Sequence, residues 1–240
     1  MHVGAPELIA SLAVVLLGSV VQGSIGFGLN LLAAPIVAII VPEALPTTLV
    51  LVAFPLTVST VAREHHAIDR VAVARMLVGA VPGTVLGLFI VTQVGATTLA
   101  TLVGSVTILG VVLSVVSPPI PITVLTGALA GFASNTFGTA AAVGGPPVAL
   151  LFQHHDGPVA RSTLGSFFAV SATMSLIGYA IAGTFHADQA LFALALLPAM
   201  LLGLWLSKHL HVFVDGGWLR PLVLAVSAVA GLIAIGRGIL

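Results

Sequence analysis

Long runs of apolar residues, separated by short polar breaks, dominate the pattern along the chain. Eight apolar segments stand out: residues 8–41, 44–62, 71–91, 96–116, 122–152, 162–184, 190–207 and 219–236. About 20 apolar residues in a helix span the hydrocarbon core of a bilayer, so the pattern predicts an all-α polytopic membrane protein. Two segments, 8–41 and 122–152, run for about 30 residues or more, which is too long for one crossing.

The two long segments also carry glycine and small polar residues near their middle. The first contains Ser24-Ile25-Gly26-Phe27-Gly28 and the second contains Ser134-Asn135-Thr136-Phe137-Gly138, so a Ser-x-x-Phe-Gly string recurs. Three ordinary segments follow each long one. We therefore expect two copies of one structural unit, residues 1–117 and 118–240, each built from a broken helical hairpin and three transmembrane helices.

The distribution of lysine and arginine distinguishes two possible topologies. If all eight segments cross the membrane, the seven cations divide four to three between its faces, and no orientation follows. If each long segment is a hairpin that returns to the side it came from, six cations share one face and Arg237 alone lies on the other. The six are Arg63, Arg70, Arg75, Arg161, Lys208 and Arg220.

The hairpin topology obeys the positive-inside rule, so we expect the six cations on the cytoplasmic side and both termini on the non-cytoplasmic side. Each unit then has three true crossings, which is an odd number. The second unit is therefore expected to be inverted relative to the first.

Composition narrows the class of protein and its partners. The chain is 59% hydrophobic and only 6% charged, with a mean hydropathy of +1.24, whereas soluble domains carry roughly 25% charged residues. We therefore expect lipid to surround most of the protein, and we expect it in the cell (inner) membrane. The net charge is zero without a basic block, which argues against nucleic acid as a partner. The absence of cysteine excludes thiol catalysis, disulfides and thiolate metal sites.

Broken helices at membrane depth suggest a binding site, because their unpaired backbone groups are tolerated only inside protein or beside a wet cavity. Inverted hairpins would bring their tips together near the midplane. New helices beginning at Leu29 and at Thr139 would then direct free N–H groups at a small anion. The candidate substrate-binding residues are Gln22, Ser24, Gly26, Gly28, Asn30, Ser134, Asn135, Thr136, Gly138, Thr139 and Arg161. We expect no metal and no cofactor.

Simpler roles compete with these assignments. Glycine and small polar residues also allow close packing between helices. Arg161 either neutralises substrate at the cytoplasmic mouth or is an interfacial arginine that only sets topology. The pairs His65-His66 and His154-His155 are better explained as loop histidines than as metal ligands, because no acidic cluster accompanies them.

Two motifs and one arginine resemble a known family. The motifs are Val21-Gln22-Gly23-Ser24-Ile25-Gly26-Phe27-Gly28 leading to Ala34-Pro35, and Gly138-Thr139 leading to Gly144-Gly145-Pro146-Pro147. They resemble the paired signatures of the TauE/SafE sulfite exporter family, and Arg161 also matches a family position. The resemblance spans essentially the whole chain. It implies export or uptake of sulfite, sulfonates such as sulfoacetate, or related sulfur-containing anions.

The leading hypothesis is a secondary transporter in which two inverted units move around a midplane anion site. An anion channel of the same architecture is an open alternative. An intramembrane enzyme is disfavoured, because residues 8–41 and 122–152 contain no Asp, Glu, Lys, Arg or His that could act as an acid, a base or its partner. The particular anion, the direction of transport, the coupling ion and the oligomeric state stay open.

Overall fold

The computed structural model describes residues 3–116, 120–214 and 219–239, and every regular element in them is helical. The helices are α1 (Ala5–Ile25), α2 (Leu29–Ile40), α3 (Thr47–Glu64), α4 (Arg70–Gln93), α5 (Ala96–Val116), α6 (Val124–Ala141), α7 (Gly145–Ala149), α8 (Gly157–Ile181), α9 (Ala187–Val214) and α10 (Leu219–Ile239). Short 3₁₀ turns cover Pro42–Ala44, His65–Ala67 and Leu150–Phe152. The all-α prediction is confirmed.

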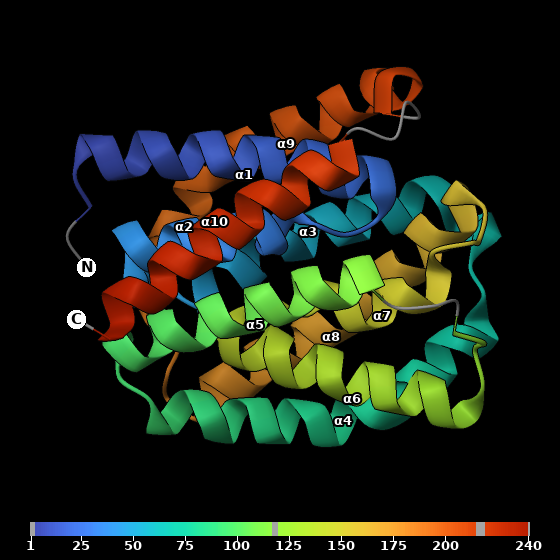
Figure 1. Ribbon diagram of the computed structural model, residues 1–240, viewed down its shortest axis with the longest axis horizontal. Helices are drawn as coiled ribbons and strands as arrows, with labels where there is room; N and C mark the ends of the chain where they lie inside the picture. The colour runs from blue at the N-terminus through green and yellow to red at the C-terminus, as the bar shows by residue number, and fades with distance from the viewer. Residues whose placement is uncertain (1–2, 117–119, 215–218, 240) are drawn as a thin grey trace.

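The helices run back and forth along the long axis of the molecule, so the connections between them lie at its two opposite ends (Figure 1). Both termini lie at one end, here called the terminal end, where Arg237 donates to the carbonyl of Ile39. At the opposite end, called the basic end, Arg161 pairs with Glu64 and Arg75 donates to the carbonyl of Ile122. The turns between α3 and α4 and between α7 and α8 lie there.

Each of the two long apolar segments is folded as a hairpin. Helix α1 runs toward the basic end, the chain turns at residues 26–28, and α2 returns toward the terminal end (Figure 1). Helix α6 runs the other way, the chain turns at residues 142–144, and α7 returns toward the basic end. The two hairpins therefore enter the molecule from opposite ends. The predicted boundary between the units, at residues 117 and 118, lies outside the described residues.

The second turn lies further along the chain than the sequence suggested. We expected a new helix from Thr139, but α6 continues through that residue and ends at Ala141. Ala142 adopts a left-handed conformation with φ of 60°, and its N–H bonds to the carbonyl of Gly138. Ala140 and Ala141 extend the helix because alanine has the highest helix propensity, and Pro146 and Pro147 prevent it from continuing much further.

Glycines bring α4 and α6 into backbone contact. Gly79, Gly83 and Gly87 recur at four-residue spacing along α4. A methyl group on Gly79 would lie 1.8 Å from the carbonyl oxygen of Ala128, and one on Gly83 would lie 2.4 Å from that of Phe132. This is the close helix packing that small residues allow in membranes. It fixes α6, and with it the second hairpin, against the first half of the chain.

The pairs of packed helices have a symmetric pattern. Helix α4 packs on α6 as α9 packs on α1, α4 packs on α8 as α9 packs on α3, and α5 packs on α7 as α10 packs on α2. The pairs α3–α8 and α5–α10 match themselves when the first five helices are exchanged for the last five. Two related units that pack through equivalent faces would give this pattern, so it supports the predicted repeat.

Much of the outer surface suits lipid. Within the described residues, α1, α4, α5, α8 and α9 contain five stretches long and apolar enough to cross a membrane. Large apolar side chains project from them, such as Val85 and Phe89 on α4 and Leu191 on α9, each more than 60% exposed. With lipid as solvent these positions are buried. The chain is a multi-pass membrane protein.

Candidate functional site

The two hairpin tips meet beside a cavity of about 70 Å³, here called the central cavity. A methyl group on Gly145, at the second tip, would lie 3.2 Å from the Cδ2 atom of Phe27 at the first. The polar side chains that line the cavity are Gln22, Asn30, Thr57, Ser134, Asn135, Ser171 and Ser175. None of the lining residues is charged. A water molecule in the liquid takes about 30 Å³, so the space suits a few waters or one small oxyanion.

The predicted residues divide into three groups. Those that line the central cavity are Gln22, Gly28, Asn30, Ser134, Asn135 and Gly138. Ser24 and Arg161 line a second cavity at the basic end. Gly26, Thr136 and Thr139 line neither, and Gly26 packs on Arg161, whose Cα would lie 3.0 Å from an added methyl group.

Gln22 connects the two arms of the first hairpin. Its Oε1 accepts a hydrogen bond of 3.1 Å from the N–H of Leu29, the first residue of α2. A free helix N–H is thereby satisfied, as in a cap. The turn that permits this passes through Gly28, whose φ of 122° suits glycine alone. Because the side-chain oxygen is engaged, the amide Nε2 of Gln22, which has no partner among the described residues, is left to donate into the cavity.

Several predicted donors use their hydrogen elsewhere. Ser24 and Thr136 each donate to the carbonyl four residues back in their own helix. Ser134 donates to the carbonyl of Gly144 and so ties α6 to the second tip. A hydroxyl carries one hydrogen, so in this conformation Ser24, Thr136 and Ser134 can only accept hydrogen bonds from a ligand.

Asn135 holds helices together through its amide group. Its Nδ2 donates to the carbonyl of Ala80 at 3.2 Å and to the Oγ1 of Thr84 at 2.6 Å, both on α4. Both amide hydrogens are therefore used, and only Oδ1 is left as an acceptor. Asn135 lines the central cavity without being able to donate to an anion there.

The remaining donors include two serines that the sequence analysis did not select. Ser171 is buried, and its hydroxyl has no hydrogen-bond partner among the described residues. Ser175 shares one hydrogen bond of 2.8 Å with Thr139, which leaves one spare hydrogen for the pair. Asn30 likewise makes no side-chain hydrogen bond in the described part of the chain. The four-residue spacing of Ser171 and Ser175, which puts both hydroxyls on one face of α8, was the available signal.

Only one hairpin presents a helix N-terminus of useful length. Helix α2 has 12 residues and begins at Leu29, beside the cavity. Helix α7 has five residues, and two of its first three are Pro146 and Pro147, which carry no N–H. The expectation of two N-termini directed at the ligand is therefore wrong for the second hairpin.

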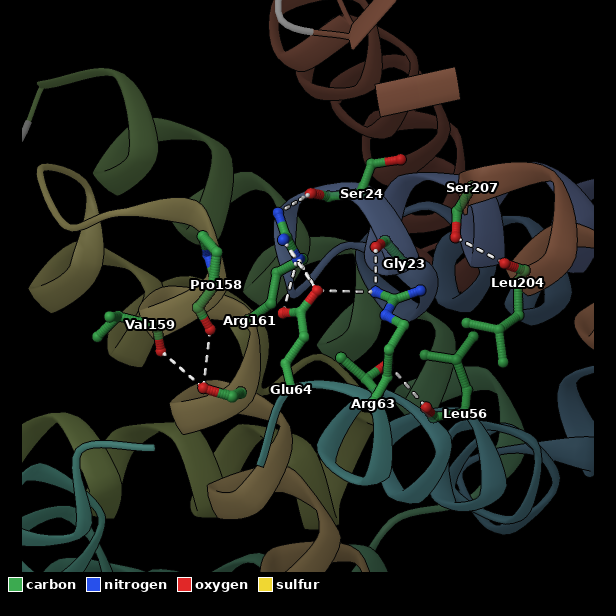
Figure 2. Close-up of polar contacts among 12 residues, drawn as sticks. Gly23, Ser24, Leu56, Arg63, Glu64, Pro158, Val159, Arg161, Leu204 and Ser207 are labelled. Atoms are coloured by element: carbon green, nitrogen blue, oxygen red, sulfur yellow. Dashed lines mark hydrogen bonds and ion pairs between the residues drawn. The ribbon is translucent and has the colours of Figure 1, made fainter. Parts of the chain in front are cut away.

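A cluster of charged side chains holds the first tip at the basic end (Figure 2). Arg161 binds Glu64 through Nε and Nη2 at 2.9–3.2 Å, and its Nη1 donates to the carbonyl of Ser24 at 3.2 Å. Arg63 donates to the carbonyl of Gly23 at 3.3 Å. These carbonyls belong to the last turn of α1, where backbone oxygens lack helical partners and cations are favourable. The Arg161 and Glu64 side chains are only 16% and 13% exposed.

Comparison with known proteins gives one match. A family model described as "Sulfite exporter TauE/SafE" matches residues 11–233, which include the turns of both hairpins and every residue that lines the central cavity. No curated protein and no solved structure matches the chain.

Proposed function

Since the chain belongs to the TauE/SafE sulfite exporter family, we propose that it is a secondary transporter of small sulfur-containing anions, such as sulfite, sulfoacetate or other organosulfonates. The observation that carries this proposal is the central cavity, which lies where the two hairpin tips meet and is lined by neutral polar groups. Cavities at the meeting point of discontinuous helices are typical substrate sites of transporters.

The free donors suit an anion that must bind and leave again. Gln22 and Ser171 line the cavity and each has a side-chain hydrogen that no described residue binds, and the N-terminus of α2 adds a partial positive charge. Hydrogen-bond donors of this kind hold an oxyanion without a cation. Transport requires binding that is favourable but weak enough to release the ion, and a neutral site meets this requirement.

Alternating access would follow from movement of one half of the molecule against the other. The two tips are in contact at Phe27 and Gly145, so relative displacement of the hairpins would open the central cavity toward one end. We place the protein in the cell membrane with the basic end in the cytoplasm, because Arg63, Arg75 and Arg161 make their contacts at that end, whereas Arg237 makes its contact at the terminal end.

Transport assays with two variants of α8 test the proposal. Ser171→Ala removes a hydroxyl that makes no hydrogen bond within the described residues, so the fold should be unaffected. A hydrogen bond to a charged group contributes about 1.5–3 kcal/mol, so we expect uptake of sulfite and sulfoacetate into proteoliposomes to need at least tenfold more substrate for half-maximal rate. Thr173→Val is the matched control, because Thr173 lies on the same helix and is exposed toward lipid.

Two results would contradict the proposal. If the substrate concentration for half-maximal uptake is unchanged in Ser171→Ala, the central cavity is not the binding site. Equally high fluxes of chloride and sulfoacetate would indicate a channel in place of a carrier.

A further inference from the structure

The second cavity lies at the basic end beside the first tip and has a volume of about 290 Å³. We call it the basic chamber. Arg161, Gln153 and His155 contribute polar groups to its wall, and Phe27 and Phe152 contribute rings. Phe27 also lines the central cavity, so it lies beside both spaces.

Two groups on the wall have unused hydrogen-bond donors. The Nε2 atom of Gln153 is buried and has no partner among the described residues. A buried donor without a partner costs free energy that a ligand acceptor would recover. Arg161 has five N–H groups, and its bonds to Glu64 and Ser24 occupy three of its nitrogen atoms while leaving further hydrogens on the two terminal ones.

The charge at this wall is positive. Glu64 lies between Arg63 and Arg161 and contacts both at 3.4 and 2.9 Å, so it compensates one of the two cations. One positive charge is left over. Gly157 makes room for the guanidinium group of Arg161, because a methyl group there would lie 2.8 Å from its Nη1 atom. The guanidinium therefore lies over the first turn of α8, where the helix dipole also favours negative charge.

Apart from Ser24 and Ser114, the rest of the wall is apolar or glycine. Phe27, Phe152 and Leu164 line the chamber together with Ile25 and Leu150. A bare inorganic ion would leave these surfaces in contact with water. An anion that carries a short carbon body would cover them and gain the free energy of burying apolar area. The chamber, at about 290 Å³, is larger than the central cavity, at about 70 Å³, and has room for such a body.

We propose that the basic chamber is a second anion-binding site, which takes organic sulfonates of a few carbon atoms. The sulfonate group binds Gln153 and Arg161, and the carbon body lies along Phe27 and Phe152. The inference rests on the proposed function for its ligand class, since the same anions are to pass through the central cavity. It adds a site with a fixed charge on the cytoplasmic side of Phe27.

Calorimetric titration of the purified protein in detergent with sulfoacetate tests this site. We expect two binding events per chain. Gln153→Glu places a negative charge in the chamber and should weaken one event by more than tenfold, while Ser171→Ala should weaken the other. Gln93→Glu is the matched control, because Gln93 is an exposed glutamine at the end of α4. It should change neither event.

The outcomes separate the two sites. A single event that Ser171→Ala weakens and Gln153→Glu leaves unchanged would overturn the chamber site. If Gln153→Glu weakens sulfoacetate binding and Ser171→Ala leaves it unchanged, the result would support the chamber site and contradict the central site. If Gln153→Glu does not fold, Gln153→Leu takes its place, since it removes the donor without adding charge. It should weaken the chamber event about tenfold, and unchanged binding would again overturn the proposal.

Discussion

Three charged side chains determine where the first hairpin tip lies. Arg63 and Arg161 bind the carbonyls of Gly23 and Ser24, and Glu64 joins the two cations. The arginines thus do two things at once, because they complete the last turn of α1 and keep a positive charge near the basic chamber. A change to one member of the cluster therefore affects both the tip and the charge of the chamber.

Glu64→Gln should destabilise the protein, because it leaves two arginines facing each other with little access to water. Removal of one partner from a buried ion pair costs about 3 kcal/mol. The loss should appear as a lower midpoint of thermal unfolding in detergent. The double variant Glu64→Gln with Arg161→Gln should lose less than the sum of the single changes, since the unpaired charge is gone. Additive losses would show that the pair is not coupled.

Sequence alone identified many cavity residues but not what each one does. Gln22, Asn30 and Asn135 were selected as neutral polar residues near glycine. The direction of a hydrogen bond, however, depends on tertiary neighbours. Asn135 turns its amide to Ala80 and Thr84, which lie more than 50 residues earlier in the chain. No local pattern encodes that choice, so the donor set could be established only from the folded chain.

At the scale of helices, the two hairpins differed in how well they could be predicted. The first turn has Gly26 and Gly28 at φ of 91° and 122°, and glycine at such positions is a direct sequence signal. The second turn has Ala142 in the left-handed region, where alanine is rare. The repeated Ser-x-x-Phe-Gly string therefore pointed to the last turns of α6, several residues before the break.

The contact between α4 and α6 offers the sharpest test at this scale. Gly83→Leu would place a side chain against the carbonyl of Phe132, which a methyl group would already approach to 2.4 Å. Because the backbone of α6 cannot move aside at this contact, α4 and α6 must separate. Asn135 would then lose its hydrogen bonds to α4. We expect aggregation or a marked loss of monodisperse protein in size-exclusion chromatography. Gly236→Leu is the control, since nothing lies within 4 Å of that position. Equal behaviour of the two variants would contradict close packing.

At the scale of the whole molecule, the distribution of lysine and arginine predicts an orientation in the membrane, with both termini on the non-cytoplasmic side. In the structure Arg63 and Arg161 lie at the basic end, where they bind the last turn of α1, and Arg237 lies at the terminal end, where it binds the end of α2. Such an orientation can be predicted from sequence because the positive-inside rule acts on each turn separately. The relative placement of the helices depends on side-chain packing and was not predicted.

Cysteine labelling tests the orientation, and the chain contains no cysteine of its own. Single variants Gly95→Cys and Gly183→Cys lie at turns of the terminal end, and His66→Cys lies at a turn of the basic end. A membrane-impermeant maleimide added to intact cells should label the first two and spare the third until the membrane is opened. Labelling of Gly95→Cys and His66→Cys from the same side would contradict the proposed topology.

The absence of charged groups around the central cavity has an electrical consequence for the proposed transporter. An unloaded neutral site crosses the membrane field without electrical work, whereas a loaded site carries the full charge of its anion. A voltage of 100 mV, negative inside, acts on each unit of charge with about 2.3 kcal/mol. If no cation travels along, the membrane voltage itself expels the anion, by a factor of about 50 in concentration for each unit of charge.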